Sequence, residues 1–508
     1  MSDPRTAAVP PDSVPPSPTG PADTLPEPAR SRGETTPDAR AARAAHRRER
    51  LGRRGPWVLG GVFFVLYAAM SVLRYLRMET ISWDLGIFEQ AIRGYAHLGA
   101  PIVDLKGPGA NVLGDHFSPI TALVAPFYRV FPSPVTLLVV QAALFALSVV
   151  PVSRAAVRAL GPATGLGIGL AYALSWGVQR GVDFDFHEIA FAMPLLAFAL
   201  EALLRGRPLR ALAWALPLLL VKEDMGATVA ALALVVAWRS RRTDQRATAV
   251  ALGTAAFALL AAVLIFYAIV PHFALHGTYD YWNKLDHGDA GPWAGLETKL
   301  RTLGWVLLPT TGLLALRSPL LLVAAPTLGW RFVSGFDHYW GTDWHYSAVL
   351  MPVVFLALVD ALPAARASAR PWLRTYARHL PAGVLAASLA VTATALPLNR
   401  LTETDTYAMP DRVAQVEQLL ERIPDGATVE ADAGPLISRL VARCRVFWIG
   451  DTRGITPQWI VAENSDHHLD ADPLSHPRSL HPRAQYRVAG MADHTILYAL
   501  IPPGAPTP

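Results

Sequence analysis

Four titratable residues crowd the segment GVDFDFHEIAF at positions 181–191, between two long apolar stretches. They are Asp183, Asp185, His187 and Glu188. If a helix begins here, Asp183 and His187 would be i,i+4 partners, and the other two residues would be i,i+3 partners. Carboxylates near a helix N-terminus suit the helix dipole. Four such groups nevertheless exceed what helix capping needs, so the cluster predicts a functional site.

Three further segments, GDHFSPI (114–120), VKEDMG (221–226) and FDHYWGTDWHYS (336–347), concentrate residues of the same types. Their titratable side chains are Asp115, His116, Lys222, Glu223, Asp224, Asp337, His338, Asp343 and His345. A turn with an Asp cap would account for the first segment, a self-neutralising structural cluster for the second, and an aromatic belt for the rings of the third. The two Asp-His pairs of the third segment have no such explanation. A binding function therefore stays open for all three segments.

These residue types also suit a divalent metal ion. The candidate ligands are Asp115, His116, His187, Glu188 and His338. The sequence contains no compact metal motif such as HExxH, and neither a P-loop nor a dinucleotide fingerprint. A divalent metal ion is therefore one option, and nothing indicates a nucleotide-driven pump.

The elements that must hold these residues belong to a membrane protein. The chain of 508 residues is 52% hydrophobic and 17% charged, whereas soluble proteins carry about a quarter charged residues. Its apolar blocks are long enough to cross a bilayer core of roughly 30 Å. The net charge of +5 reflects arginines placed for topology, so no nucleic-acid partner is expected. The single cysteine, Cys444, excludes an internal disulfide.

About eleven transmembrane helices are predicted, after a disordered cytoplasmic tail of residues 1–55. The spans are 57–76, 134–152, 162–178, 189–204, 211–221, 226–238, 247–270, 303–316, 318–333, 346–363 and 380–397. Arginine clusters on both sides of residues 211–238 favour a hairpin there, because the positive-inside rule places both clusters in the cytoplasm. The hairpin turn would recess Lys222, Glu223 and Asp224 below the outer surface. Such charges are tolerable only if they face one another or water, so an outward-open polar cavity is predicted.

This topology places the motifs on the outer side of the plasma (inner) membrane. The outer segments would be 77–133, 179–188, 222–225, 271–302, 334–345 and everything after residue 398. Residues 82–99 predict an amphipathic helix that lies in the membrane interface. Its apolar positions are Leu85, Phe88, Ile92 and Tyr95, and the polar positions opposite them are Glu89, Gln90 and Arg93. Asp84 precedes this helix, either as its N-cap or as a carboxylate held at the cavity rim.

Residues 398–508 have an ordinary composition and predict a small extracytoplasmic α/β domain. Within residues 410–432 an amphipathic helix would begin at Asp411, and a turn and a short strand would follow it. A second helix candidate covers 433–443. Strand-like runs follow at 445–449, 458–462 and 495–500. No catalytic motif is present in this part of the sequence. The predicted fold is thus an all-α polytopic membrane domain, residues 56–397, followed by an α/β domain.

The motifs WDLGIFEQAI, GDHFSPITALVAPFY, DFDFHEIA and LLLVKEDMG, in this order, resemble a large prokaryotic family of predicted membrane proteins, domain of unknown function 2079. The similarity runs from about residue 80 to 350, with IPDGATVEAD beyond it. The family is itself similar to the GT-C class of membrane glycosyltransferases, which take a sugar from a polyprenyl-phosphate carrier on the outer face. In that class the general base is an acidic residue in the first outer loop, beside an interfacial helix. Asp84 matches this placement, although the fuller acidic signatures of the named GT-C families are absent.

The resemblance implies how such a site would work. An acceptor hydroxyl would give its proton to Asp84, and the leaving polyprenyl phosphate would be met by Lys222 and Arg180. Sugar hydroxyls or a metal ion would be oriented by Asp185, His187 and Glu188, and the remaining titratable residues of the four segments would line the substrate cavity. The implied partners are a lipid-linked sugar donor, membrane lipids, and an acceptor glycan, lipid or protein.

Two other classes of protein fit the same residues. A transporter or channel would also carry charges within the membrane, although the hydropathy pattern contains no internal repeat of the kind that many transporters have. In a non-catalytic assembly or sensing protein, the clusters would be structural polar networks, and mutating them would unfold the protein.

Overall fold

The computed structural model describes residues 37–285, 291, 293–467, 469 and 471–502. It consists of two compact units, Met1–Arg47 and Arg48–Pro508, and the contacts below lie within the second. Helix α1 (Pro37–Leu76) begins well before the first predicted span. The predicted tail boundary at residue 55 therefore falls inside a helix, since the Ala- and Arg-rich sequence after Pro37 has a high helix propensity. The rest of that tail, residues 1–36, lies outside the described residues.

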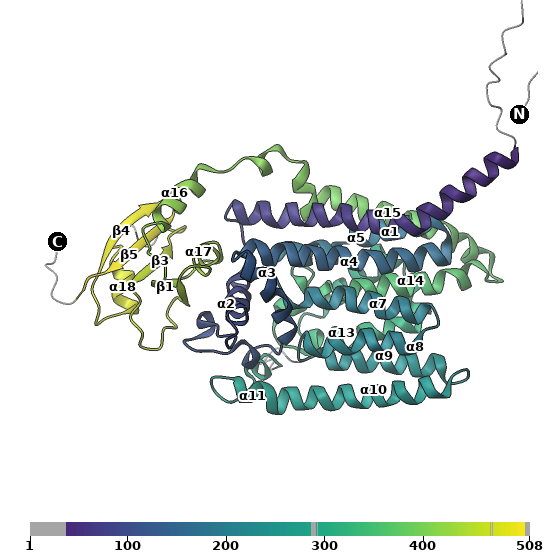
Figure 1. Ribbon diagram of the computed structural model, residues 1–508, viewed down its shortest axis with the longest axis horizontal. Helices are drawn as coiled ribbons and strands as arrows, with labels where there is room; N and C mark the ends of the chain where they lie inside the picture. Colours follow the sequence, from purple (N-terminus) through teal and green to yellow (C-terminus); the bar gives the residue numbers. More distant parts are fainter. Residues whose placement is uncertain (1–36, 286–290, 292, 468, 470, 503–508) are drawn as a thin grey trace, which may run out of the picture. The chain divides into compact units, whose positions relative to one another are not determined.

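Most of the second unit is helical (Figure 1). After α1 the longer helices are α4 (Pro134–Leu160), α5 (Pro162–Ala173), α6 (Trp176–Asp183), α7 (Ala192–Leu204), α8 (Pro208–Ala215), α9 (Met225–Ser240), α10 (Gln245–Leu264), α12 (Leu296–Thr311), α13 (Ala325–Val333), α14 (Leu350–Arg366) and α15 (Pro371–Ala395). Each predicted span coincides with one or more of these helices, so the helices lie where the apolar blocks predicted them.

The number of helices that cross the membrane stays a prediction. Among the described residues, four helices are long and apolar enough to do so: Ala45–Leu76, Pro134–Leu160, Gln245–Phe273 and His345–Arg366. The apolar helices Pro208–Leu220, Met225–Ser240 and Pro319–Val333 are shorter. Helix α8 is short because the chain passes into a 3-10 helix, η5 (Leu216–Leu220), which contains Pro217. Proline lacks the backbone N–H that a continued α-helix would need.

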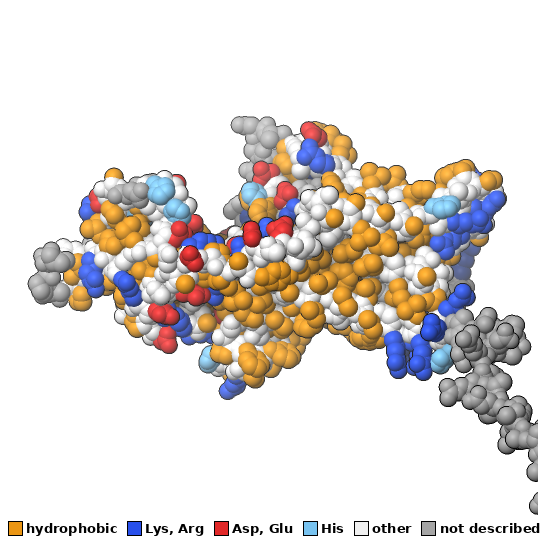
Figure 2. Space-filling model, turned by 90° about the horizontal axis from the view of Figure 1, so that it is seen from above, with side chains coloured by type: hydrophobic (Ala, Val, Ile, Leu, Met, Phe, Trp, Pro, Cys, Tyr) orange, Lys and Arg blue, Asp and Glu red, His pale blue; other side chains and the backbone are white. Residues whose placement is uncertain are grey.

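Helix α14 forms the centre of the helical region and α10 its rim. In its most apolar window α14 is 83% buried, against α4, α7, α12 and α15, whereas the corresponding window of α10 is 22% buried and packs mainly on α9. Figure 2 shows hydrophobic side chains over the flank of the helical region, with Lys and Arg gathered at one end and acidic side chains toward the other. This separation agrees with the charge asymmetry expected from the sequence.

The C-terminal domain has a five-stranded sheet. Its elements are α16 (Asp411–Leu420), β1 (Thr428–Ala431), α17 (Gly434–Leu440), β2 (Arg445–Trp448), β3 (Trp459–Glu463), α18 (Ser475–Leu480), β4 (Tyr486–Ala492) and β5 (Thr495–Leu500). The strand order is β2-β1-β3-β5-β4, with β1 parallel to β2 and β3, and β5 antiparallel to β3 and β4. The predicted α/β character and four of the five strands, β1, β2, β3 and β5, are confirmed. Strand β4 escaped prediction because a register shift between Val488 and Gly490 breaks its alternation.

Helix α2 (Asp84–Ala96) lies between the helical region and the C-terminal domain. Leu85 and Ile92 belong to the hydrophobic core of the helical region, whereas Ile87 and Ala91 belong to the core of the C-terminal domain. The predicted helix is confirmed, and its polar side chains are covered by protein. Gln90 and Arg93 donate to the backbone oxygens of Val446 and Val441 in the C-terminal domain, and Glu89 is fully buried and accepts from the hydroxyl of Tyr128.

Candidate functional site

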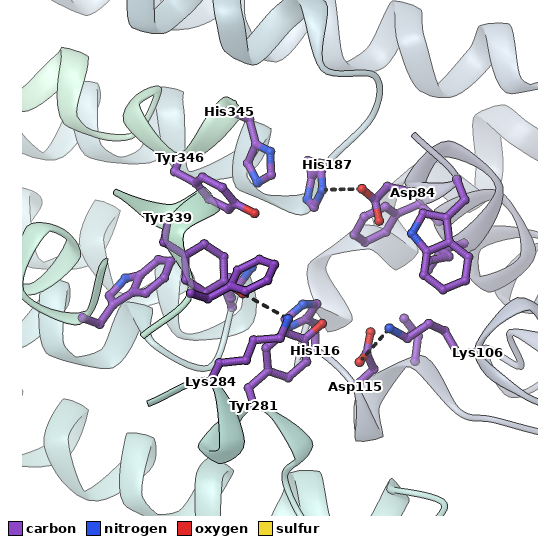
Figure 3. Close-up of a pocket in the computed structure, with 17 residues that line it drawn as sticks. Asp84, Lys106, Asp115, His116, His187, Tyr281, Lys284, Tyr339, His345 and Tyr346 are labelled. Carbon is purple, nitrogen blue, oxygen red and sulfur yellow. Dashed lines mark hydrogen bonds and ion pairs between the residues drawn. The ribbon is translucent and has the colours of Figure 1, made fainter. Parts of the chain in front are cut away.

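A pocket of about 210 Å³ lies where the loops of several motifs meet (Figure 3). It is lined by Trp83, Asp84, Ile87, Phe88, Lys106, Val112, Asp115, His116, His187, Lys222, Tyr281, Lys284, Trp330, Phe336, Tyr339, His345 and Tyr346. Six of the titratable residues singled out in the sequence therefore share one cavity: Asp84, Asp115, His116, His187, Lys222 and His345. The aromatic residues Phe336, Tyr339 and Tyr346 of the third motif line it as well.

Asp84 presents a carboxylate to this pocket. It is the first residue of α2, Trp83 occupies the N-cap position, and no side chain caps the helix. The hydroxyl of Ser82 donates to Oδ2 of Asp84 at 2.5 Å, and Nε2 of His187 lies 3.6 Å from the same oxygen. Burial opposes ionisation, but the hydrogen bond and charge of His187 outweigh it and lower the pKa of Asp84. Asp84 is therefore an ionised group in the pocket and not a helix cap.

His187 lies between two carboxylates. Its Nδ1 is 2.8 Å from Oε2 of Glu188, and its ring stacks on that of His345 with 3.9 Å between centroids. Burial favours the neutral ring, yet Glu188 and Asp84 together raise the pKa of His187 to about 9. The side chain is thus an imidazolium at neutral pH, and Glu188 behind it is fully buried and also pairs with Nζ of Lys222 at 2.9 Å.

Glu223 joins two other loops of the pocket. It is buried and accepts hydrogen bonds from Nδ1 of His116 at 2.8 Å, from the backbone N–H of Phe117 at 3.1 Å and from the hydroxyl of Tyr279 at 2.8 Å. Burial opposes its ionisation, and His116 and Lys222 reverse that effect and lower the pKa of Glu223 to about 2. Glu223 therefore holds the pocket wall from behind, as a charged group that is not itself among the lining residues.

Three of the chain's four lysines line the pocket. Lys106 pairs with Asp115 at 3.2 Å, and Lys222 pairs with Glu188. Lys284 has no carboxylate partner among the described residues. It donates to the hydroxyl of Tyr339 at 3.2 Å, and its Nζ lies 3.9 Å from the ring centroid of Tyr281. Burial and the neighbouring Lys106 lower the pKa of Lys284 to about 8, so this cation has charge available for an anionic ligand.

Residues 74–483 match the model of a family described as "Predicted membrane protein (DUF2079)". The chain belongs to this family. None of the curated proteins matches its sequence.

Solved structures with a similar fold are GT-C glycosyltransferases. ArnT from Cupriavidus metallidurans bound to undecaprenyl phosphate is 14% identical, with a TM-score of 0.53 over 89% of this chain and 100% of that chain. The apo form of the same ArnT gives a TM-score of 0.48 at 14% identity, over 87% of this chain and 97% of that one. The apo oligosaccharyltransferase of Archaeoglobus fulgidus is 14% identical, with a TM-score of 0.37 over 88% of this chain and 75% of that chain. The likeness to the first ArnT structure shows a shared fold, and the predicted family is confirmed.

In this DUF2079 member, the segment 183–188 runs from the end of one helix to the start of the next. Helix α6 ends at Asp183, Asp185 follows at a φ of +68°, and the 3-10 helix η4 (Glu188–Phe191) begins at Glu188 and leads into α7. The predicted i,i+4 pairing of Asp183 with His187 is therefore wrong. The chain reverses at Asp185, so that its neighbours point in different directions.

Asp183 and Asp185 hold the segment that leads to Asp84 and do not line the pocket. Asp183 pairs with Nη1 of Arg74 at 2.9 Å. Oδ2 of Asp185 accepts from the backbone N–H groups of Ile81 at 3.0 Å and of Ser82 at 3.4 Å. They thereby position the residues immediately before the carboxylate of the site.

Three other residues that were predicted to bind substrate also lie off the pocket wall. Arg180 is on α6, and within the described parts of the chain it forms no hydrogen bond or ion pair. His338 is half-exposed and pairs with Asp337 at 2.8 Å. Asp224 adjoins Lys222 and Glu223 in the hairpin turn but is not among the lining residues. Its Oδ1 is buried without a hydrogen-bond partner among the described residues.

The sequence interpretation missed the lysines and aromatic residues contributed by other loops. Lysine is scarce in this chain, with four lysines beside 41 arginines, and that contrast could have drawn attention to Lys106 and Lys284. It also missed Arg331, which is fully buried and donates to the backbone oxygens of Tyr339 and Gly341, both at 2.8 Å, and to Oγ of Ser347 at 3.0 Å. Arg331 thereby holds the loop that carries the aromatic wall of the pocket.

The residues expected as metal ligands do not come together into a metal site in the part of the chain that the structure describes. No group of three or more His, Cys, Asp or Glu side chains there could hold a metal ion. His187 and His116 instead each use one ring nitrogen to contact a buried carboxylate.

Proposed function

We propose that the protein is an integral membrane glycosyltransferase that transfers a sugar from a polyprenyl-phosphate carrier to an extracytoplasmic acceptor, with Asp84 as general base. The observation that carries the proposal is the pocket itself, in which an ionised carboxylate and an unneutralised lysine, Lys284, share a small cavity with aromatic walls. The GT-C fold shared with an ArnT that binds undecaprenyl phosphate supports a lipid-linked donor.

The residues of the pocket divide into those near the proton and those near the phosphate. Oδ2 of Asp84 is engaged by Ser82 and His187, whereas Oδ1 accepts no hydrogen bond from the described residues. Oδ1 would take the proton of the acceptor hydroxyl while the oxygen of that hydroxyl attacks the anomeric carbon of the donor sugar. The bond from the anomeric carbon to the phosphate oxygen breaks, and the electron pair leaves with the polyprenyl phosphate.

Cations on the opposite loops would stabilise the leaving phosphate. Lys284 pairs with no carboxylate in the described part of the chain, and Lys222 shares its charge with Glu188. Preorganised charges in a pocket that excludes water stabilise developing charge more strongly than water does. Lys284 therefore takes the part that Arg180 was expected to take, because Arg180 does not line the cavity. His187 has a supporting part, since its imidazolium keeps Asp84 ionised before the reaction.

The proposal includes an orientation in the membrane. The N-terminus would be cytoplasmic, and the pocket and the C-terminal domain would face outward. The gathering of Lys and Arg at the end of the helical region away from the acidic side chains (Figure 2) supports this orientation.

The test is transfer of radiolabelled sugar from polyprenyl-phosphate donors into polymer or lipid acceptors, with membranes that carry the full-length protein. Asp84→Asn keeps the shape of the side chain and removes the base, so transfer should fall by about a hundredfold or more. The matched control is Asp337→Asn, because Asp337 is 73% exposed and lies off the pocket wall. If folded wild-type protein transfers no sugar from any donor, or if Asp84→Asn is as active as wild type, the proposal is refuted and a transporter becomes the better assignment.

A further inference from the structure

The C-terminal domain reaches the pocket through strand β2. The ring of Trp448, the last residue of that strand, lies 4.4 Å from the ring of Trp83 between centroids, with 57° between the ring planes. Trp83 lines the pocket and immediately precedes Asp84. Nζ of Lys106 lies 5.3 Å from the Trp83 ring centroid. Trp83 is thus supported by an indole of the C-terminal domain and contacted by a lysine of the pocket.

The other end of β2 holds the segment that carries Lys106. Nε of Arg445 donates to Oδ2 of Asp104 at 2.7 Å, and its Nη2 donates to Oδ1 at 2.9 Å. Asp104 begins the short helix η1 (Asp104–Lys106) and also accepts from the backbone N–H of Gly109 at 2.9 Å. A two-point pair between guanidinium and carboxylate fixes orientation as well as distance. Arg445 therefore orients the helix that presents Lys106 to the pocket.

Further contacts hold β2 in place. Gln90 of α2 donates from Nε2 to the backbone oxygen of Val446 at 2.8 Å and accepts from the N–H of Leu105 at 3.1 Å, which links α2, β2 and η1. On the far side, the fully buried Glu430 accepts from the N–H of Gly450 at 2.6 Å, just after β2. The strand is therefore held from the pocket side and from the sheet side.

We infer that Trp448 and Arg445 are positioning residues for the reaction at Asp84, so that the C-terminal domain is part of the transferase site. The inference rests on the proposed function. Neither residue lines the pocket: Trp448 acts through Trp83 on the start of α2, and Arg445 acts through Asp104 on Lys106. Removing the Trp448 ring leaves Trp83 without its support and lets the adjoining carboxylate move. A displacement of about 1 Å at a reacting group can cost about a hundredfold in rate.

The experiment compares variants of the full-length protein in the transfer assay and in the binding of a polyprenyl phosphate without sugar. Trp448→Ala should lower kcat about tenfold to a hundredfold with little change in the KM for the acceptor. Trp448→Phe should restore most of the rate, because it keeps an aromatic ring against Trp83. Lys106 lines the same pocket as Lys284 and Lys222, and in this proposal it adds its charge to theirs beside the phosphate. Arg445→Gln should therefore weaken polyprenyl-phosphate binding and raise the donor KM about tenfold, since a charge-assisted contact contributes about that much.

The matched controls come from the same sheet. Trp459 on β3 packs on the same hydrophobic core as Trp448 without contacting Trp83, and Arg487 on β4 is exposed. Trp459→Ala and Arg487→Gln should leave kcat, the donor KM and binding near wild type. Equal losses in Trp448→Ala and Trp459→Ala, or no rescue by Trp448→Phe, would reduce the contact to a folding role and overturn the inference.

The two proposals fail differently. If wild-type protein transfers sugar and the Trp448 and Arg445 variants match it, positioning fails and the proposed function stands. If wild-type protein binds polyprenyl phosphate without transferring sugar, the proposed function fails, and unaltered binding by Arg445→Gln overturns the positioning part as well. If wild-type protein neither binds nor transfers, both proposals are refuted.

Discussion

The charge state of His187 makes the stability of the protein depend on pH in the alkaline range. In the folded protein Glu188 and Asp84 contact the two ring nitrogens and raise the pKa of His187 from 6.5 to about 9, against the effect of burial. In the unfolded chain the ring keeps its ordinary pKa. The stabilisation is therefore fully present below pH 6.5 and is lost as the pH rises through about 9.

The magnitude follows from the size of the pKa shift. A rise from 6.5 to about 9 corresponds to about 3 kcal/mol of unfolding free energy, at 1.36 kcal/mol for each unit. Since the His187 side chain is 9% exposed, solvent screening reduces this figure little. His187→Gln removes the titrating group, so the stability difference between wild type and variant should shrink by about 3 kcal/mol between pH 6 and pH 10.

The assay is unfolding of the detergent-solubilised full-length protein at pH 6, 7.5 and 10, followed by tryptophan fluorescence. Taking the difference between two proteins at each pH cancels the titration of the groups that His187 does not contact. His338→Gln is the control for the loss of an imidazole, because that ring is 52% exposed and its ion pair is with the neighbouring Asp337. A constant difference between wild type and His187→Gln from pH 6 to pH 10 would refute the imidazolium between two carboxylates.

Three further predictions concern the pocket and its supports. Lys284→Met should weaken polyprenyl-phosphate binding about tenfold or more, with Lys299→Met unchanged, and wild-type binding should fall as the pH rises through 8, where Lys284 loses its proton; binding that is indifferent to both changes would exclude Lys284 from the phosphate site. Arg331→Met should speed hydrogen exchange in residues 339–347, and Arg331→Lys should not restore protection, because an ammonium cannot reach three acceptors in a fixed fork; slow exchange in both variants contradicts the assigned role. Burial raises the pKa of Glu89 from 4.5 to about 8. Between these values Glu89 ionises in the unfolded chain and stays protonated in the fold, so the free energy of unfolding falls as the pH rises. Glu89→Gln should therefore raise the unfolding midpoint at pH 8 more than at pH 5, and an equal effect at both pH values would contradict the buried acid.

Local sequence determined where the helices and strands lie along the chain. Apolar blocks predicted where the helices lie, since a bilayer core admits backbone only with its hydrogen bonds satisfied within the element. The motifs around Asp84, His116, His187 and Lys222 were expected in loops on one face, and these residues do meet in one pocket. The α/β character of the C-terminal domain was equally readable, because strand alternation and helix periodicity are properties of neighbouring residues.

Tertiary structure alone decided which side chain of each motif faces the pocket. In DFDFHE the reversal at Asp185 turns His187 into the cavity and Asp183 toward Arg74, and a spacing argument that assumed a helix assigned these positions wrongly. The direction of a side chain depends on the backbone conformation of its loop, and the contacts that settle that conformation come from far along the chain. Oε1 of Gln141 on α4, for example, accepts from the N–H of His187.

The same reason explains why the cations and supports of the site were missed. Lys106 and Lys284 stand in separate loops with no motif around them, and they meet only because the helices between them pack in one way. Trp448 reaches Trp83 only because the C-terminal domain packs on α2. Sequence patterns with periods of a few residues specify helices, strands and their apolar faces. Contacts between distant segments depend on how those faces pack together, and that packing decided the chemistry of this pocket.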